Sequence, residues 1–383
     1  MLKRIPPAEA TIAFIDLQAQ RNQIADEIDI AIARVLDHGQ FILGKEVDAA
    51  EKKLAEFCGA EHTIACASGT DALALILMAI DVGRGDAVIC PAFTFAAPAE
   101  VIALRGATPI FADVLPKTFN IDPESAKSAI DLAREQGLQP KALIAVDLYG
   151  QPADYDELSA LCDAEGLMLI DDAAQSFGAT FDGRPVGTLA HATATSFFPA
   201  KPLGCYGDGG AVFTDDADLA DRLRSLRMHG QGTDRYEHPR VGLNSRLDAI
   251  QAAILVEKLR IFPAEIIARG RVAARYNDAF AERLMIPAVD QRATSVWAQY
   301  TLRLGNRDRE VFRATLQTDG VPTAVHYPHA LHRQEAYSSY PVANGAARAS
   351  EQLATEVVSL PMHPYLDEPT QDRVIDSVLR ATG

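Results

Sequence analysis

The sequence predicts an α/β fold in which a mostly parallel sheet lies between layers of helices. From about residue 60 to 230, seven short apolar or β-branched runs alternate with segments of helical periodicity. One such segment, TDALALILMAI, places four apolar residues at the i, i+3, i+4, i+7 spacing of a helix face: Leu73, Ile76, Leu77 and Ile80. Strands that alternate with helices need crossover connections, and these give parallel strands that are buried on both faces.

The expected strands follow one another regularly along this region. They cover residues 63–67, 87–90, 108–112, 142–146, 167–171, 193–198 and 211–214. Asp154 and Glu157 have the spacing of a capping box at the start of a helix, and Gly166 suits the end of that helix. Ligands of such sheets bind beyond the carboxyl ends of the strands, so we expect the chemistry in the segments that follow the strands.

The pattern changes past residue 248. There the helical stretches LDAIQAAILVEKLRIF and RGRVAARYNDAFAERL precede a mixed tail with strands near Val296–Leu304. At 383 residues the chain is long for a single core. We therefore expect a large domain with an N-terminal arm over residues 1–247 and a smaller α+β domain over residues 248–383.

Composition is typical of a soluble globular protein, with 48% apolar and 23% charged residues. No apolar run reaches the roughly 18–20 residues that span a bilayer, and the N-terminus lacks the pattern of an export signal. The five cysteines are scattered without paired spacing, which favours a reducing cytoplasm. The net charge of −16 argues against nucleic acid or an anionic membrane surface as a partner, although a small anionic ligand needs only a local cluster of positive charge.

The segment Ser68-Gly69-Thr70 lies between an expected strand and an expected helix. The start of a helix offers unpaired N–H groups and the positive end of its dipole, which together bind phosphate. A plain helix cap would use the same residues. The acidic side chain of Asp71, in the same turn, has to point away from a bound phosphate.

Asp171 and Asp172 close the apolar run LMLI. Buried carboxylates need a cationic or hydrogen-bonding partner, so these acids form a structural ion pair, cap a helix or hold the protonated nitrogen of a heterocycle. The segment PAFTFAAP follows another strand, and its two aromatic residues either belong to the core or stack on a flat ring at the ligand-binding edge.

Lys201 lies in SFFPAKPLGCYGDGG, between two prolines and before four glycines. An exposed lysine needs no such frame, whereas a buried lysine has a lowered pKa and is a nucleophile suited to Schiff-base formation. The glycines allow the backbone to pass close to a bulky ligand. The segment GCYGDGG does not match a dinucleotide-binding loop, because it lacks the G-x-G-x-x-G spacing. Pyridoxal 5'-phosphate requires an anion-binding site, an aromatic side chain that stacks on its ring, an acid beside its ring nitrogen and a lysine in a fixed position. The four segments above together offer a candidate for each.

These residues lie within a longer resemblance. The chain resembles the DegT/DnrJ/EryC1/StrS sugar aminotransferases, which have fold type I and depend on pyridoxal phosphate. The similarity runs nearly end to end, through FIDLQAQ, GQFILGKEV, SGTDAL, PAFTF, LYGQPADYD, DDAAQSFGA, SFFPAKPLGCYGDGGA, RMHGQ, VGLNSRLDAIQAAIL, VPTAVHYP and SLPMHPYL. The lysine segment and HYP are most similar to members that aminate C3 of UDP-2-acetamido-2-deoxy-3-oxo-glucuronate for O-antigen or other surface-polysaccharide synthesis. In those members glutamate donates the amine and leaves as 2-oxoglutarate.

The resemblance implies a role for each residue around the cofactor ring. Lys201 forms the Schiff base and then moves the proton between substrate and cofactor. Asp172 pairs with the pyridinium nitrogen, and Phe95 stacks on the ring. Gln175 lies against the other face of the ring or near its 3'-oxygen.

The resemblance also implies a phosphate site in the large domain. Gly69, Thr70, the backbone of Asp71, and Ser196 hold the phosphate in this reading. Asn244 reaches the same phosphate from a partner subunit, so the expected working unit is a homodimer with shared active sites.

Both expected substrates are anionic, which calls for cationic or hydrogen-bonding side chains. The candidates are Arg246, His229, His326 and Tyr327, each of which could instead be structural. An arginine suits a carboxylate because its guanidinium binds both oxygens at once.

The run HYPHALH has three histidines at three-residue spacing, as some metal sites do. Pro328 interrupts a helix there, and no cysteine or acid completes a ligand set. We therefore expect no metal, a substrate contact at His326, and surface positions for His329 and His332.

The sequence argues against three other activities. Dehydratases on this scaffold carry histidine in place of the lysine, and Lys201 argues against that chemistry. A hydride-transferring, NAD-dependent nucleotide-sugar oxidoreductase would need a dinucleotide fingerprint where SGTDAL stands. A catalytically idle scaffold or regulator would have lost the lysine, acid or phosphate positions, and all of these are present.

Overall fold

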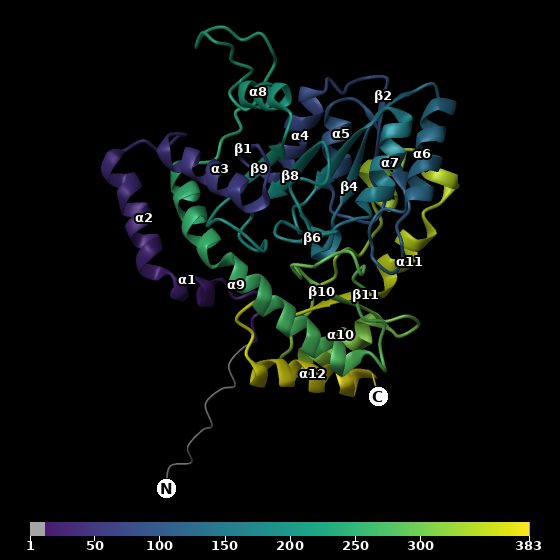
Figure 1. Ribbon diagram of the computed structural model, residues 1–383. Helices are drawn as coiled ribbons and strands as arrows, with labels where there is room; N and C mark the ends of the chain where they lie inside the picture. Colours follow the sequence, from purple (N-terminus) through teal and green to yellow (C-terminus); the bar gives the residue numbers. More distant parts are fainter. Residues whose placement is uncertain (1–11, 383) are drawn as a thin grey trace.

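The computed structural model describes residues 12–382, so residues 1–11 of the expected N-terminal arm lie outside the described residues. Its centre is a seven-stranded sheet in the order β1-β9-β8-β5-β4-β2-β3 (Figure 1). β9 runs antiparallel to its neighbours β1 and β8, and the other neighbouring pairs are parallel. The strands are β1 (His62–Cys66), β2 (Asp86–Pro91), β3 (Thr108–Ala112), β4 (Gln139–Val146), β5 (Met168–Asp172), β8 (Ala192–Ser196) and β9 (Gly210–Thr214).

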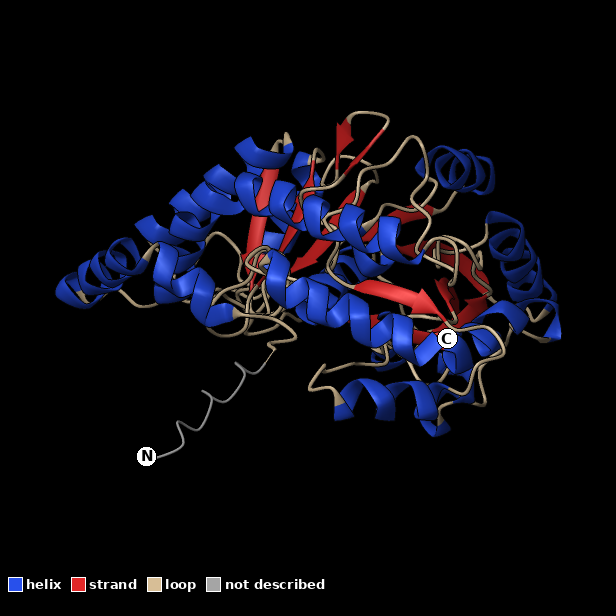
Figure 2. Cartoon of the chain, turned by 90° about the horizontal axis from the view of Figure 1, so that it is seen from below, coloured by secondary structure: helices blue, strands red, loops and turns tan. Residues whose placement is uncertain are grey.

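Helices cover both faces of this sheet, as Figure 2 shows from below. One face packs on α4 (Gly69–Ala79), α5 (Ala97–Leu104) and α8 (Ala217–Leu226). The other face packs on α6 (Pro123–Glu135) and α7 (Tyr155–Glu165), and toward β1 and β9 on α3 (Lys45–Cys58) and α9 (Ala249–Phe280). The expected α/β class with a mostly parallel sheet is confirmed.

Helix α7 begins and ends as its sequence predicts. The carboxylate of its cap, Asp154, accepts a hydrogen bond from the N–H of Glu157. Gly166 ends the helix in the left-handed conformation, with φ 68°. That conformation carries little cost in glycine because no Cβ is present.

Helix α9 runs for 32 residues through Pro263, joining the two predicted helical stretches across the intervening PAEIIA. Its first half packs Leu255 and Phe262 into the core beneath β9, and its second half packs Tyr276 and Phe280 into a different core. The burial of an apolar stripe on both sides of Pro263 outweighs the loss of one backbone hydrogen bond. Because α9 contributes to both cores, the domain boundary at residue 247 stays a prediction.

The second core is built around the antiparallel pair β10 (Tyr300–Arg303) and β11 (Val357–Leu360). The helices α10 (Arg309–Thr318) and α12 (Glu368–Thr382) pack on this pair, and α11 (Arg348–Glu356) precedes β11. The expected strand near Val296–Leu304 was too long, because residues 296–299 are loop and Trp297 has a positive φ of 51°.

Smaller elements complete the chain. α1 (Leu17–Gln23) and α2 (Ala25–His38) extend to the left in Figure 1, and α2 packs Ile28 and Ala31 against α9. The short strands are β6 (Thr180–Phe181) and β7 (Arg184–Pro185); the 3₁₀ turns are η1 (Leu148–Gly150), η2 (Leu331–Arg333), η3 (Glu335–Tyr337) and η4 (Ala343–Gly345). Over residues 12–382, no helix is both long and apolar enough to cross a bilayer.

Candidate active site

A cavity of about 490 Å³ opens at the carboxyl ends of β4, β5 and β8, marked by Val146, Asp172 and Ser196. This volume lies in the range of small-molecule sites. A hollow of about 560 Å³ lies near Met168, at the opposite end of β5, but none of the predicted site residues lines it. The predicted residues that line the first cavity are Gly69, Thr70, Phe95, Asp172, Gln175, Ser196, Lys201, His326 and Tyr327.

Lys201 is held by a compact turn after β8. Its N–H donates to the carbonyl of Phe198 at 2.9 Å, and the N–H of Cys205 donates to that of Phe197 at 2.7 Å. A Cβ on Gly204 would lie 2.5 Å from the Phe198 carbonyl oxygen, so the turn closes only with glycine there. Burial lowers the pKa of the Lys201 amine, and Asp172 partly opposes this shift. A desolvated amine with a lowered pKa is an available nucleophile and base.

Asp172 and its neighbour Asp171 point to opposite faces of β5, because side chains alternate along a strand. Asp172 lines the cavity, and burial raises its pKa to about 6 against the opposing effects of the Ala174 N–H and of Lys201. Asp171 accepts a hydrogen bond from the Thr193 hydroxyl at 3.1 Å, while its Oδ1 has no partner among the described residues. Burial raises the pKa of Asp171 well above its usual value.

The start of α4 forms the wall next to β8. The Ser68 hydroxyl oxygen accepts from the N–H of Asp71 at 3.1 Å, so Ser68 is indeed a helix cap. Gly69 and Thr70 line the cavity beside it, whereas Asp71 does not. A Cβ on Gly69 would lie 2.7 Å from the Cβ of Ser196, so glycine brings the helix start onto the end of β8. The dipole of α4 and the hydroxyls at this junction suit an anion.

Two aromatic rings and one amide also line the cavity: Phe95, Tyr327 and Gln175. The Phe95 ring is 55% exposed and lies 6.1 Å from the Tyr327 ring, between centroids, whereas Phe93 belongs to the core. Gln175 accepts a hydrogen bond on Oε1 from the Tyr149 N–H at 2.8 Å, and its Nε2 donates to the Tyr327 hydroxyl at 3.4 Å. The amide of Gln175 is therefore fixed in one orientation.

His326 enters the cavity from the segment beside β11. Its Nδ1 lies 3.0 Å from the Ser359 hydroxyl, and burial together with Lys201 lowers the pKa of its imidazole. The expected surface position of His332 was wrong: this ring is buried, and its Nε2 lies 2.8 Å from a Glu351 carboxylate oxygen. His329 is exposed. The part of the chain that the structure describes holds no group of three metal-ligating side chains.

Besides Asp71, three predicted residues do not line this cavity: Asn244, Arg246 and His229. Asn244 and His229 are exposed, and Arg246 is partly buried. They share one region, because the N–H of His229 donates to the carbonyl of Leu243 at 2.8 Å. A residue that contacts the site of a partner subunit has to lie outside the cavity of its own subunit, and Asn244 does lie outside it.

Several functional candidates were missed. Phe14, Ile15, Thr94, Asp208 and Gln299 also line the cavity. Tyr149 lies behind it and contacts three of its walls: its N–H donates to Gln175, its hydroxyl to the His326 carbonyl, and its own carbonyl accepts from the Gln299 N–H at 3.4 Å. The motif LYGQPADYD pointed to the Tyr149 segment, but no local pattern reveals contacts between such distant parts of the chain.

The model of the DegT/DnrJ/EryC1/StrS aminotransferase family matches residues 22–379. The chain belongs to this family. A UDP-2-acetamido-2-deoxy-3-oxo-D-glucuronate aminotransferase from Pseudomonas aeruginosa is 50% identical over 359 residues, which are 93% of this chain and 96% of the relative. The resemblance seen in the sequence is confirmed, and so is the expectation of a transaminase rather than a hydride-transferring enzyme.

Solved structures of DegT/DnrJ/EryC1/StrS aminotransferases show the same fold. One from Brucella abortus has a TM-score of 0.95 and 49% identity, covering 97% of this chain and all of that chain, 100%. The family depends on pyridoxal phosphate, and the NtdA structure from Bacillus subtilis, with a TM-score of 0.88 and 28% identity over 98% of this chain and 86% of its own, contains the cofactor PMP.

Proposed function

We propose that this aminotransferase moves the amino group of glutamate to the 3-keto carbon of UDP-2-acetamido-2-deoxy-3-oxo-glucuronate. The observation that carries the reaction type is the convergence of half-buried Lys201 and buried Asp172 on one cavity that also contains the start of α4. The substrate assignment rests on the 50% identity, over 93% of the chain, to a relative named for that reaction.

The cavity residues fit pyridoxal 5'-phosphate. The phosphate would bind at Gly69, Thr70 and Ser196, where the helix dipole favours an anion. Asp172 would hold the ring nitrogen protonated, and Phe95 would stack on the ring. When bound, the cofactor supplies an electron sink for the carbon from which a proton is removed.

Lys201 would carry the cofactor and transfer the proton. Its lowered pKa keeps a fraction of the amine neutral, and a neutral amine can accept a proton from the substrate carbon. The turn at Gly204 fixes the backbone from which this amine reaches into the cavity. The reaction therefore depends on an amine whose position and proton affinity are both set by the fold.

A homodimer is part of the proposal. Asn244 would contact the phosphate of the partner's cofactor, and the region that contains Asn244 also contains His229 and Arg246. Exposed apolar side chains of the N-terminal region, Ile30, Leu36 and Phe41, offer surface for a second copy to cover. His326 and Tyr327 would bind the substrate from within the protomer.

The proposed product is UDP-2-acetamido-3-amino-2,3-dideoxy-glucuronate, made in the cytoplasm for O-antigen or another surface polysaccharide. The five cysteines are all buried and unpaired, which suits a reducing compartment. The second candidate is transamination of another nucleotide-linked 3- or 4-keto sugar, since the same cofactor site would serve it.

A two-step half-reaction tests the substrate. Glutamate is added to the cofactor-loaded enzyme until its visible absorption shifts completely, glutamate is removed, and candidate nucleotide keto-sugars are added one at a time. We expect the UDP-linked 3-keto uronate to restore the original spectrum fastest. Faster recovery with a dTDP- or GDP-linked sugar would favour the second candidate, and no shift with glutamate would contradict the proposed amino donor.

Arg246→Ala is expected to raise KM for the keto-uronate about ten- to a hundredfold, because loss of a carboxylate–guanidinium contact costs roughly 1.5–3 kcal/mol. Cofactor retention should stay near the wild-type value. Steady-state kinetics with the keto-uronate and with the corresponding sugar lacking the carboxylate provide the measurement. An unchanged KM for the keto-uronate would contradict the role of Arg246, and an equal rise for both sugars would assign it to another part of the substrate.

A further inference from the structure

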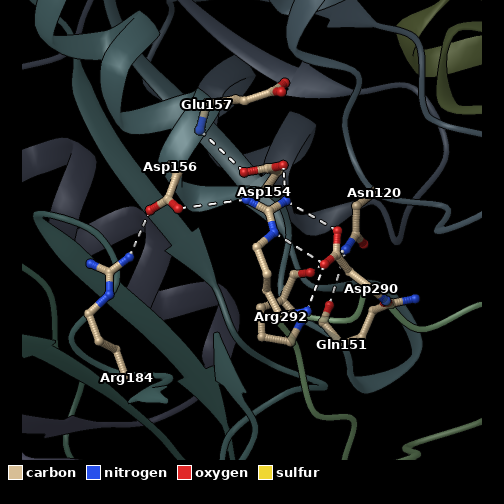
Figure 3. Close-up of polar contacts among 9 residues, drawn as sticks. Asn120, Gln151, Asp154, Asp156, Glu157, Arg184, Asp290 and Arg292 are labelled. Atoms are coloured by element: carbon tan, nitrogen blue, oxygen red, sulfur yellow. Dashed lines mark hydrogen bonds and ion pairs between the residues drawn. The ribbon is translucent and has the colours of Figure 1, made fainter. Parts of the chain in front are cut away.

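The loop before β10 is held by polar contacts with the segment between η1 and the start of α7. Arg292 pairs with Asp154 at the start of α7 and with Asp290 in its own turn, and it approaches Asp156 at 3.6 Å (Figure 3). Gln151 donates to the Ala288 carbonyl at 2.8 Å. These contacts fix the path of the chain as it passes from α9 toward β10.

Closer to the cavity, the same loop lies directly on η1. The Val296 N–H donates to the Gly150 carbonyl at 2.9 Å. Gly150 has φ 110°, and a Cβ there would lie 2.8 Å from the N atom of Ala298 and 2.9 Å from that of Trp297. Any other residue at position 150 would push the loop outward, so the close approach is built into the backbone.

These contacts place Gln299 at the cavity. Its N–H donates to the Tyr149 carbonyl at 3.4 Å, and its side chain lines the cavity together with Lys201 and His326. The amide oxygen of Gln299 is buried and has no hydrogen-bond partner among the described residues. Of the described residues that line the cavity, it is the only side chain with a buried polar atom left unpaired.

Burying a hydrogen-bond acceptor without a donor costs free energy. An unpaired acceptor beside a binding cavity is therefore suited to a donor group on the ligand. We infer that Gln299 is a specificity residue whose amide oxygen accepts a hydrogen bond from a hydroxyl or amide N–H of the nucleotide sugar. This inference rests on the proposed function. It deepens that function, because the proposed sugar offers both a ring hydroxyl and an acetamido N–H.

The amide oxygen of Gln299 is not suited to binding glutamate, the proposed amino donor. The carboxylates of glutamate only accept hydrogen bonds, and its single donor is the nitrogen that is transferred. Gln299 should therefore act in the sugar half-reaction and be nearly silent in the glutamate half-reaction. This separation distinguishes recognition of the sugar from general support of the cavity.

The test compares Gln299→Met, which keeps the length and removes the acceptor, with Gln291→Met as a matched control. Gln291 is an exposed glutamine of the same loop, outside the cavity. For Gln299→Met we expect a loss of about ten- to a hundredfold in kcat/KM for the UDP-linked keto-uronate, from one unpaired hydrogen bond. The rate of the glutamate half-reaction, the cofactor spectrum and the Tm should match the wild type, and Gln291→Met should match it throughout.

Calorimetry with UDP-2-acetamido-2-deoxy-glucuronate, which has a hydroxyl in place of the ketone, gives the Kd without turnover. A Kd raised about tenfold in Gln299→Met supports the inference. Unchanged sugar kinetics and Kd would overturn it, as would equal losses in both half-reactions. If the wild type itself aminates none of the keto-sugars, the proposed function fails and this inference fails with it.

Discussion

Lys201→Ala is expected to abolish transamination. The variant loses both the covalent attachment of the cofactor and the amine that transfers the proton, and general acid–base catalysis alone contributes about 10²–10⁴-fold. Its kcat should fall by at least that factor. Borohydride reduction followed by peptide mapping should place the cofactor on the peptide that contains Lys201 in the wild type, and on no peptide in the variant.

The chain offers a matched control for this experiment in Lys258 of α9. Its amine is also buried, has no hydrogen-bond partner among the described residues, and has a pKa lowered by burial to about 8. It lies 4.8 Å from the centre of the Tyr206 ring and does not line the cavity. Lys258→Met should retain both the label at Lys201 and transamination. A label on Lys258 in the wild type would contradict the assignment of Lys201.

Asp172→Asn is expected to lower kcat by roughly a hundredfold or more. The amide cannot stabilise a protonated ring nitrogen, and removing one partner of a buried charge pair costs about 3–5 kcal/mol. Cofactor affinity should fall as well. Equilibrium dialysis of the cofactor and single-turnover rates with glutamate measure the two effects separately.

The pH dependence of cofactor binding gives a second readout of Asp172. Burial raises the pKa of its carboxyl from the ordinary 3.8 to about 6. The carboxylate is therefore charged above about pH 6 and becomes neutral as the pH falls through that value. Cofactor affinity of the wild type should drop over this window, and in Asp172→Asn this component should disappear.

Asp171→Asn is the matched control, one residue away on the opposite face of β5. Its carboxyl does not line the cavity, and burial raises its pKa, which favours the neutral form, so an amide of the same shape should leave cofactor affinity and kcat within about twofold. A loss as large as that of Asp172→Asn would show that the two acids act together rather than separately.

The difference between these two acids illustrates how far sequence reasoning reached. Spacing indicated that two carboxylates end a buried strand and need partners, and the family resemblance assigned Asp172 to the ring nitrogen. The pleat of β5 placed Asp172 toward the cavity and Asp171 toward Thr193 of β8. Likewise, SGTDAL predicted the start of a helix, and the structure added that Gly69 allows this helix to touch Ser196.

Residues that are distant in the sequence were the ones that escaped prediction. Gln299 follows no local motif, Phe14 belongs to FIDLQAQ but nothing local placed it at the site, and Tyr149 supports the site through contacts with residues from several other segments. His332 is buried because α11 brings Glu351 to its ring, which the spacing of HYPHALH could not indicate.

Local order and periodicity predicted the sheet with its covering helices and the strand ends where ligands bind, and motifs together with the family resemblance pointed to the lysine, the acid and the helix start at that edge. These follow from the sequence because hydrophobic periodicity, capping and strand order act between near neighbours. Tertiary structure decided which side chains share the cavity, which of the two carboxyls faces it and which polar atom lacks a partner. Those properties depend on burial and on contacts across the fold, and both exist only once α9 and the β10–β11 pair have packed against the sheet.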